Sequence, residues 1–376
     1  MDAKTLGLFG GVLVLLGIAT LVVRFLKRRA DLGLDPAIVE TFRLRVWAWW
    51  MLFAPLAGAL LAGKMLTIVF FGLISFWALR EFITLTPTRP ADHRALFWVF
   101  FFCTPLQYVF LMLAGRTWFE EPLGITAYDV YSIFIPVYAF LLIPARIAFS
   151  GDSKRFLERT AKIQAGLLIC VYCLSYAPAL LTLNLPPEEH QAARPAEPPP
   201  PAEAAADVEP EQHPLPAGLA QIGTLAEAAQ GEIKMPHEAP GRKVRLLFFF
   251  VLIVQLADAT QYLWSQLPGR HAIVPSISPA RTWEGLLGSA ASVTLVGAAL
   301  WFLTPYQWWQ AALASLVVSL TAFGGGLTMS AIKRDRGVKD YGTLIEGHGG
   351  ILDRIDSLCF SAPVFFHLTY LFVNLS

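Results

Sequence analysis

Charged residues are scarce in this chain. Only 15% of its 376 residues are Asp, Glu, Lys or Arg, whereas 55% are hydrophobic. A soluble enzyme of this length carries a larger charged share, so the composition excludes that class. The formal net charge of +1 also gives no basis for a nucleic-acid partner.

Cysteine is equally rare, with four residues in the whole chain. Cys103, Cys170, Cys173 and Cys359 all lie in apolar stretches. The Cys170-x-x-Cys173 pair is therefore interpreted as small apolar helix residues, in preference to a redox or zinc site.

The hydrophobic residues form long blocks instead of alternating with polar ones. A helix needs roughly 20 mostly apolar residues to cross the hydrocarbon core of a membrane, where an open backbone has no hydrogen-bond partner. The blocks predict an all-α, polytopic membrane protein with nine or ten transmembrane helices. The segment 65–79 is the shortest candidate, and the segment after 246 must continue beyond Asp258 to cross. The predicted spans are 6–23, 46–62, 65–79, 95–114, 125–143, 163–183, 246–257, 286–303, 308–330 and 358–375.

Basic residues cluster at alternate ends of these spans, which sets the expected topology. The N-terminus and the segment after residue 183 are then outside. The basic run 242–245 conflicts with this scheme, because it falls at an outer end. The clusters expected on the cytoplasmic side are 24–29, 80–94, 154–162, 270–281 and 333–339.

A change of composition divides the chain. Residues 186–243 are rich in Pro, Ala and Glu, and such a segment cannot bury enough apolar surface to fold. We expect a disordered linker here, between an N-terminal transmembrane region (1–185, about six spans) and a C-terminal transmembrane region (244–376, about four spans). No chemistry is legible in the linker.

The N-terminal region offers few candidate functional groups. Glu81, beside Arg80, and Asp129 are its only ionisable groups near span ends that could face an internal cavity. Local pairing and snorkelling explain these residues equally well, and are the preferred interpretation.

The segment 330–356 is different from the rest of the chain. It places several cations, four Asp, one His and five Gly between two membrane spans. A positive-inside loop accounts for the cations but not for the glycines or for Asp340, Asp353 and Asp356. An enzyme acting on a triphosphate needs cations, carboxylates that hold a divalent metal, and backbone that approaches phosphates closely. This segment supplies all three, and Asp353 and Asp356 are spaced to share one helix face.

A second polar cluster, 276–285, follows a span that contains Asp258. Acids inside a membrane are candidate functional residues because they are costly to bury. The alternative interpretation is structural: a turn at Ser278, an interfacial anchor at Trp283 and a helix cap at Glu284. The cluster alone does not decide between them.

Together the two clusters resemble phosphatidate cytidylyltransferases. The loop Ser278-Pro279 with Thr282-Trp283-Glu284-Gly285 is similar to a loop of that family, with Ala280 and Arg281 in place of two lysines. Gly326 stands where many bacterial members carry an Asp. The C-terminal signature is filled by Ser330, Lys333-Arg334, Lys339-Asp340, Gly347-His348-Gly349-Gly350 and Asp353-Arg354-x-Asp356.

The resemblance covers about residues 246–376. It implies transfer of the cytidylyl group of CTP to phosphatidic acid, with Mg²⁺ and in some members a monovalent cation such as K⁺. It also suggests a homodimer in a bacterial inner membrane, with the active site facing the cytoplasm. It implies catalytic roles for Lys333, Arg334, Lys339, Asp340, His348 and Asp353, substrate binding by Ser278, Arg281, Glu284, Ser330, Gly347, Gly349, Gly350, Arg354 and Asp356, and metal binding by Asp353 and Asp258.

Two other functions fit the same residues. One is a CTP-dependent enzyme with a different lipid acceptor, such as a polyprenol kinase or a cytidylyltransferase for another lipid phosphate. The other is a membrane protein or transporter without catalysis, whose basic Gly-rich loop only binds anionic lipid headgroups. The identity of the lipid product distinguishes the first alternative from transfer to phosphatidic acid. The absence of any Mg²⁺ dependence distinguishes the second.

Overall fold

The structure, a computed structural model, describes residues 3–28, 36–85, 88–114, 126–185, 240–266, 271–342 and 349–375. The chain divides into two units, of which one comprises Met1–Asn184 with Pro240–Ser376 and the other Leu185–Ala239. Every helix and strand below belongs to the first unit. The predicted linker 186–243 lies almost wholly outside the described residues, and the predicted division into domains stays a prediction.

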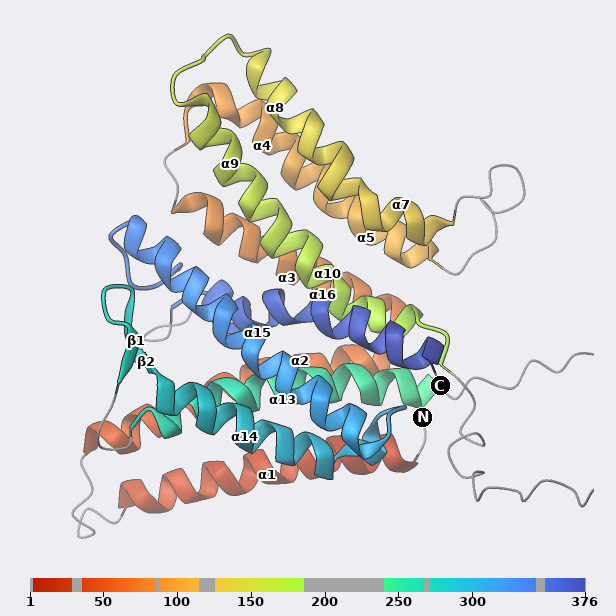
Figure 1. Cartoon of the computed structure of the whole chain (residues 1–376), viewed down its shortest axis with the longest axis vertical. Coiled ribbons are helices and arrows are strands. Elements are labelled where there is room, and N and C mark those ends of the chain that lie inside the picture. Colours follow the sequence, from red (N-terminus) through yellow and green to blue (C-terminus); the bar gives the residue numbers. More distant parts are fainter. Residues whose placement is uncertain are drawn as a thin grey trace, which may run out of the picture. The chain divides into compact units, whose positions relative to one another are not determined.

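All secondary structure in the described N-terminal part of this unit is helical (Figure 1). Three of its helices are interrupted by π-helical turns, and Pro105 follows the first of these while Pro136 lies within the second. A proline lacks the N–H that an α-helix needs, which favours such local widening. The elements are α1 (Ala3–Arg28), α2 (Pro36–Ala62), α3 (Lys64–Thr84), η2 (Pro90–Asp92), α4 (His93–Trp98), η3 (Val99–Cys103), α5 (Thr104–Leu113), α7 (Ala127–Ile133), η5 (Phe134–Ala139), α8 (Phe140–Ala148), α9 (Phe156–Leu167), η6 (Leu168–Cys173), α10 (Leu174–Ala179) and η7 (Leu180–Thr182).

The C-terminal part contains four long helices and one hairpin. The two short antiparallel strands pair Ala272 with Thr282 and Val274 with Ser278. The hairpin leads directly into a helix whose first turn is capped by Thr282, because its Oγ1 accepts the Gly285 N–H at 3.0 Å. The elements are α13 (Pro240–Trp264), β1 (Ala272–Val274), β2 (Ser278–Thr282), α14 (Trp283–Ala299), η8 (Trp301–Leu303), α15 (Trp308–Asp335) and α16 (Leu352–Leu375).

The predicted membrane architecture is confirmed. Eight helices in the described part of the chain are long and apolar enough to cross a membrane. The other two predicted spans fall on the apolar stretch Trp49–Ala62 of α2 and on α14, which has 17 residues. The span predicted at 65–79 extends to Thr84 in α3, and α13 continues past Asp258 to Trp264, as the sequence required.

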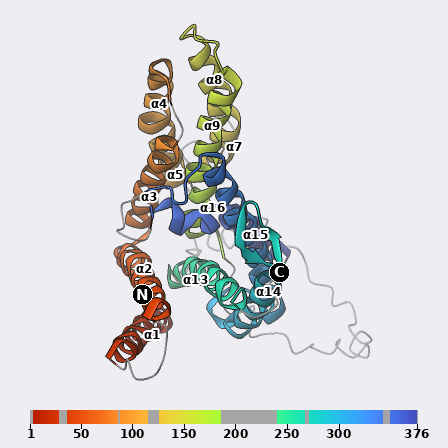
Figure 2. The ribbon, with the colours of Figure 1, turned by 90° about the vertical axis from the view of Figure 1, so that its left-hand side faces the viewer.

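Helices from both halves of the sequence pack against α16. On one side α13 and α15 contact it, with the Phe250 and Phe365 rings stacked at 4.8 Å. On the other side α3 and α10 contact it, with the Tyr176 and Phe366 rings 5.2 Å apart. Both views place α16 among these helices (Figures 1 and 2). The start of α16 is therefore reached by side chains from the N-terminal helices as well as from α13 and α15.

Candidate active site

The end of α15 and the start of α16 bring two predicted catalytic residues together. Lys333, in the last turn of α15, donates from Nζ to Oδ1 of Asp353 at 2.8 Å. Both side chains are largely buried, with 14% and 8% of their surface exposed. The ammonium group also lies 5.3 Å from the centre of the Tyr341 ring. The Coulomb attraction within a pair so shielded from water is stronger than within one on an open surface.

The second oxygen of Asp353 binds backbone instead of a cation. Its Oδ2 accepts the Tyr341 N–H at 2.8 Å and the Gly350 N–H at 2.9 Å. Gly349 has a φ of +78°, and a Cβ there would lie 2.7 Å from the same oxygen. Glycine is therefore required at 349 both by the backbone conformation and by the close approach of Asp353. The use of these glycines as a phosphate cradle stays a prediction, since the Gly350 amide donates to Asp353.

Two other carboxylates, Asp258 and Asp356, share one hydroxyl group. Ser357 Oγ donates to Oδ1 of Asp258 at 2.9 Å and lies 3.4 Å from Oδ1 of Asp356. Asp258 comes from the membrane helix α13 and Asp356 from α16. Thus the structure places Asp258 beside Asp356, whereas Asp353 binds Lys333.

These oxygens suit a hard divalent cation. No group of three or more His, Cys, Asp or Glu side chains that could hold a metal occurs among the described residues. Mg²⁺ does not need such a group, because it usually takes one or two carboxylates and completes its shell with water and substrate phosphates. The pair formed by Asp258 and Asp356 fits that requirement.

Arg281 brings a further positive charge from the hairpin. Its Nη1 donates to the carbonyl of Phe323 at 3.1 Å, and its guanidinium lies 5.1 Å from the centre of the Phe323 ring. A Cβ at Gly326 would overlap this guanidinium, so glycine at 326 makes room for it. The charges of both Arg281 and Lys333 act on Asp356. Neither partner of Arg281, a carbonyl and a ring, neutralises its charge.

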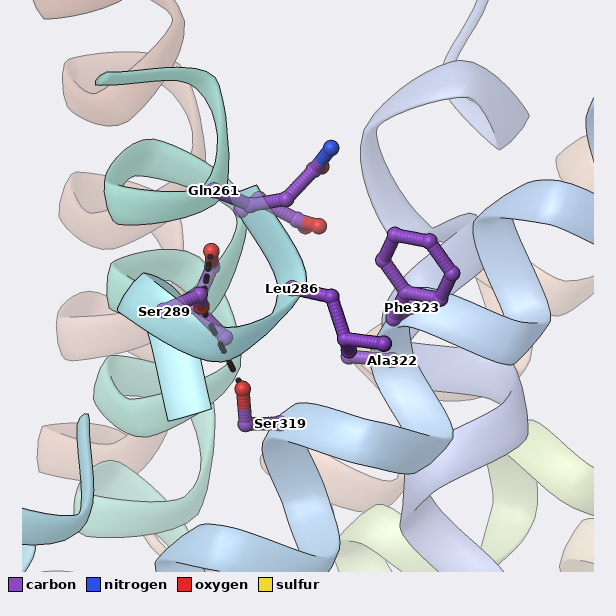
Figure 3. A pocket seen from close by; sticks show the side chains of 8 residues that line it. Gln261, Leu286, Ser289, Ser319, Ala322 and Phe323 are labelled. Carbon is purple, nitrogen blue, oxygen red and sulfur yellow. Dashed lines mark hydrogen bonds between the residues drawn. The ribbon is translucent and has the colours of Figure 1, made fainter. Parts of the chain in front are cut away.

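A narrow recess lies between α13, α14 and α15, and Asp258 is among its lining residues. Figure 3 shows Gln261 and Phe323 on opposite sides of this recess. Ser289 and Ser319 lie deeper, with their Oγ atoms 3.2 Å apart. The recess is lined by Ala257, Asp258, Gln261, Leu286, Ser289, Ser319, Ala322 and Phe323.

Other predicted site residues contact the hairpin or their own helix. Arg334 donates to the carbonyl of Ile277 at 3.2 Å, which joins the hairpin to the end of α15, as Figure 2 also shows. Glu284 accepts the His271 backbone N–H at 3.1 Å and contacts the His271 ring at 2.6 Å. Ser330 Oγ donates to the Gly326 carbonyl at 2.7 Å.

Four of the remaining predicted residues lie among the described residues. Lys339 and Asp340 are exposed, and Arg354 is half-buried in the first turn of α16. Ser278 is the first residue of β2. Gly347 and His348 lie outside the described residues. Their predicted roles stay predictions.

Sequence reasoning underestimated Glu81. Local pairing is the right explanation for Asp129, which exchanges hydrogen bonds with Thr126 at the start of α7. Glu81 instead reaches α16, where its carboxylate accepts the backbone N–H groups of Ile351 and Leu352. The available signal was an acid near the end of a membrane span, but no sequence pattern connects residue 81 with residue 351.

Comparisons with known proteins show which family the chain belongs to. The sequence profile of the cytidylyltransferase family matches residues 43–372. An uncharacterized protein of Escherichia coli (strain K12), YnbB, is 32% identical over 354 residues, which cover 94% of each chain.

Two phosphatidate cytidylyltransferases are similar over a shorter segment. The protein of Mycobacterium leprae is 39% identical over 132 residues, 34% of this chain and 40% of that protein. The protein of Staphylococcus epidermidis is 37% identical over 130 residues, 34% of this chain and 50% of that protein. This chain thus matches half or less of the length of these two relatives. Because the family profile spans most of the sequence, the chain belongs to the cytidylyltransferase family of nucleotidyltransferase enzymes.

Proposed function

We propose that this protein transfers the cytidylyl group of CTP to phosphatidic acid, giving CDP-diacylglycerol and pyrophosphate. The observation that carries the proposal is the convergence at the start of α16 of Lys333 and Arg281 with the carboxylates of Asp353, Asp356 and Asp258. Partly buried cations beside metal-competent carboxylates suit a polyphosphate substrate. The family and the names of the shorter relatives support the same reaction.

The reaction requires little covalent chemistry from the protein. A phosphate oxygen of phosphatidate attacks the α-phosphorus of CTP, a new P–O bond forms, and the bond to the β-phosphate breaks so that pyrophosphate leaves. The nucleophile is already anionic near neutral pH, since the second pKa of a phosphomonoester is about 6. The protein's task is positioning and neutralisation of charge. Arg281 is the described cation best placed for this neutralisation, because it contacts a carbonyl and a ring, whereas Lys333 is paired with Asp353.

Mg²⁺ would be held by Asp258 and Asp356, whose carboxylates meet at Ser357. When bound, the ion neutralises phosphate charge and polarises the reacting phosphoryl group. Asp353 has a different task in this proposal. It is bound by Lys333 and two backbone amides, so it holds the lysine and the Gly349–Gly350 turn in place for the nucleotide.

The membrane location suits a lipid acceptor. The cytoplasmic ends of α15 and α16 give a water-soluble nucleotide access to Lys333, while lipid tails stay among the helices. We place the site on the cytoplasmic side because the basic clusters follow the positive-inside pattern. A bacterial inner membrane is the corresponding location.

The decisive experiment is an assay of purified protein with radiolabelled CTP and phosphatidic acid, with the lipid product resolved by chromatography. We expect Mg²⁺-dependent CDP-diacylglycerol, lost on chelation and reduced at least ~100-fold in Asp353→Asn. Asp335→Asn is the matched control, because Asp335 is 67% exposed and pairs with Arg336 at the same end of α15. Full activity of a folded Asp353→Asn protein would contradict the assigned role.

A different lipid acceptor is the second candidate. Its support is that a relative matching 94% of this chain is uncharacterized, while the two phosphatidate enzymes match about a third of this chain. Labelled lipid from another phosphorylated acceptor, with none from phosphatidate, would favour it. No labelled lipid and no Mg²⁺ effect with any acceptor would favour an anionic-lipid-binding protein without catalysis.

A further inference from the structure

A buried carboxylate from the N-terminal region lies at the start of α16. Glu81, near the end of α3, is only 5% exposed. Its Oε1 accepts the Ile351 N–H at 3.0 Å and its Oε2 accepts the Leu352 N–H at 2.8 Å. The first amides of a helix have no partner within the helix, and a carboxylate there also interacts favourably with the helix dipole. Glu81 therefore caps α16 from a distant part of the sequence.

Two glycines pack directly on this carboxylate. A Cβ at Gly342 would lie 3.0 Å from Oε1, and a Cβ at Gly350 would overlap the carboxylate itself. A Gly342 Cβ would also lie 3.3 Å from the Cα of Gly350. The backbone at Gly350 thus approaches Glu81 more closely than a residue with a Cβ could without a shift, and the backbone at Gly342 leaves little room for a Cβ.

The contacts of Glu81 continue into the proposed active site. Three consecutive amides are bound by carboxylates: Gly350 N–H by Asp353, then Ile351 N–H and Leu352 N–H by Glu81. The same Asp353 binds Lys333. Movement of the first turn of α16 would therefore displace Asp353 and its lysine together.

We propose that Glu81 is a positioning residue for the reaction, and that α3 thereby supplies an essential part of the active site. The inference rests on the proposed function and deepens it. Glu81 does not touch substrate in this proposal. It fixes the backbone on which Asp353 and Asp356 are carried, and misplacement of such groups by about 1 Å can reduce a rate by ~100-fold.

The test compares Glu81→Gln and Glu81→Asp with wild type. Glutamine keeps the length of the side chain but replaces one acceptor oxygen by an NH₂ group that faces a backbone N–H. Aspartate keeps the charge and both acceptors on a shorter side chain. The matched control is Glu40→Gln, because Glu40 pairs with Arg43 at an exposed position.

Three readouts are needed. Hydrogen exchange of peptides covering 349–356, without substrate, measures how well the backbone at the start of α16 is protected. Binding of radiolabelled CTP with Mg²⁺ in the absence of lipid measures the affinity for the nucleotide. Turnover with phosphatidic acid then measures the rate of the reaction.

In Glu81→Gln we expect about tenfold faster exchange confined to 349–356, and a kcat ~10–100-fold lower with a smaller change in KM for CTP. Glu81→Asp should recover part of the kcat, and Glu40→Gln should match wild type.

Unchanged exchange in Glu81→Gln would overturn the proposal. So would faster exchange with unaltered CTP binding and turnover, because Glu81 would then be only a helix cap. If wild type binds CTP but forms no product from phosphatidate, the proposed acceptor fails. In that case, weaker CTP binding in Glu81→Gln would still support a positioning role for Glu81, and unaltered CTP binding would overturn that role.

Discussion

Two groups of carboxylates lie near the predicted cytoplasmic helix ends, and their oxygens bind different kinds of partner. In the ion-pair cluster, formed by Asp92, Asp152, Arg89 and Arg159, both acids bind arginine side chains. In the site cluster, formed by Glu81, Asp258, Asp353 and Asp356, Asp353 forms an ion pair with Lys333. The others bind backbone amides or share the hydroxyl of Ser357.

This difference distinguishes the ion-pair cluster, which stabilises the fold, from the site cluster, which is proposed to bind ligands. Arg159 and Asp92 are 5% and 1% exposed and neutralise each other, so nothing is left for a charged ligand. Arg281 is bound by a carbonyl and an aromatic ring, which leave its charge available to a phosphate. Asp258 and Asp356 share the hydroxyl of Ser357, and carboxylate oxygens of this kind suit a divalent metal ion.

The largest expected effect follows from adding one methyl group to the site cluster. Gly350→Ala would place a Cβ on the Glu81 carboxylate, so either this carboxylate leaves the Ile351 and Leu352 amides or the start of α16 shifts together with Asp353. We expect at least ~100-fold lower turnover in the CTP and phosphatidate assay. Gly324→Ala is the control, because a Cβ there meets nothing within 4 Å. Equal activities of the two variants would remove the basis for a tightly built site cluster.

A stability effect is expected from the ion-pair cluster. Arg159→Ala leaves the buried Asp92 carboxylate without its main partner, which typically costs about 3 kcal/mol. The thermal midpoint of the purified protein should fall clearly, while turnover per folded molecule at low temperature should stay near the wild-type value. Arg43→Gln, at an exposed pair with Glu40, should change the midpoint little. A selective loss of turnover in Arg159→Ala would show that this cluster also serves the reaction.

The sequence predicted the helices and singled out several residues of the candidate site, for physical reasons. Long apolar blocks have only one stable form in a membrane, so the spans were readable, and Asp258 was conspicuous as an acid inside one of them. Lys333 and Asp353 could be connected because they flank one loop.

The sequence did not predict the contacts between helices that are distant along the chain. The meeting of Asp258 with Asp356 and of Glu81 with Ile351 depends on how α13 and α3 pack against α16. The space at Gly326 for Arg281 depends on the packing of the hairpin against α15. Such packing follows from side-chain shapes that no local pattern encodes.

The smallest expected effect concerns Asp152, in the loop between α8 and α9. A hydrogen bond from Arg89, together with the Lys154 backbone N–H, lowers the pKa of Asp152 below its ordinary value of 3.8. A lowered pKa means that this pair stabilises the fold above about pH 3.8 and that the contribution is lost as the pH falls through the lower, folded-state pKa. Thermal midpoints of wild type and Asp152→Asn should therefore differ slightly at pH 7 and converge in strong acid. A difference that widened in acid would mean that protonated Asp152 is the stabilising form, and the ion-pair cluster would no longer contrast with the site cluster in the way proposed.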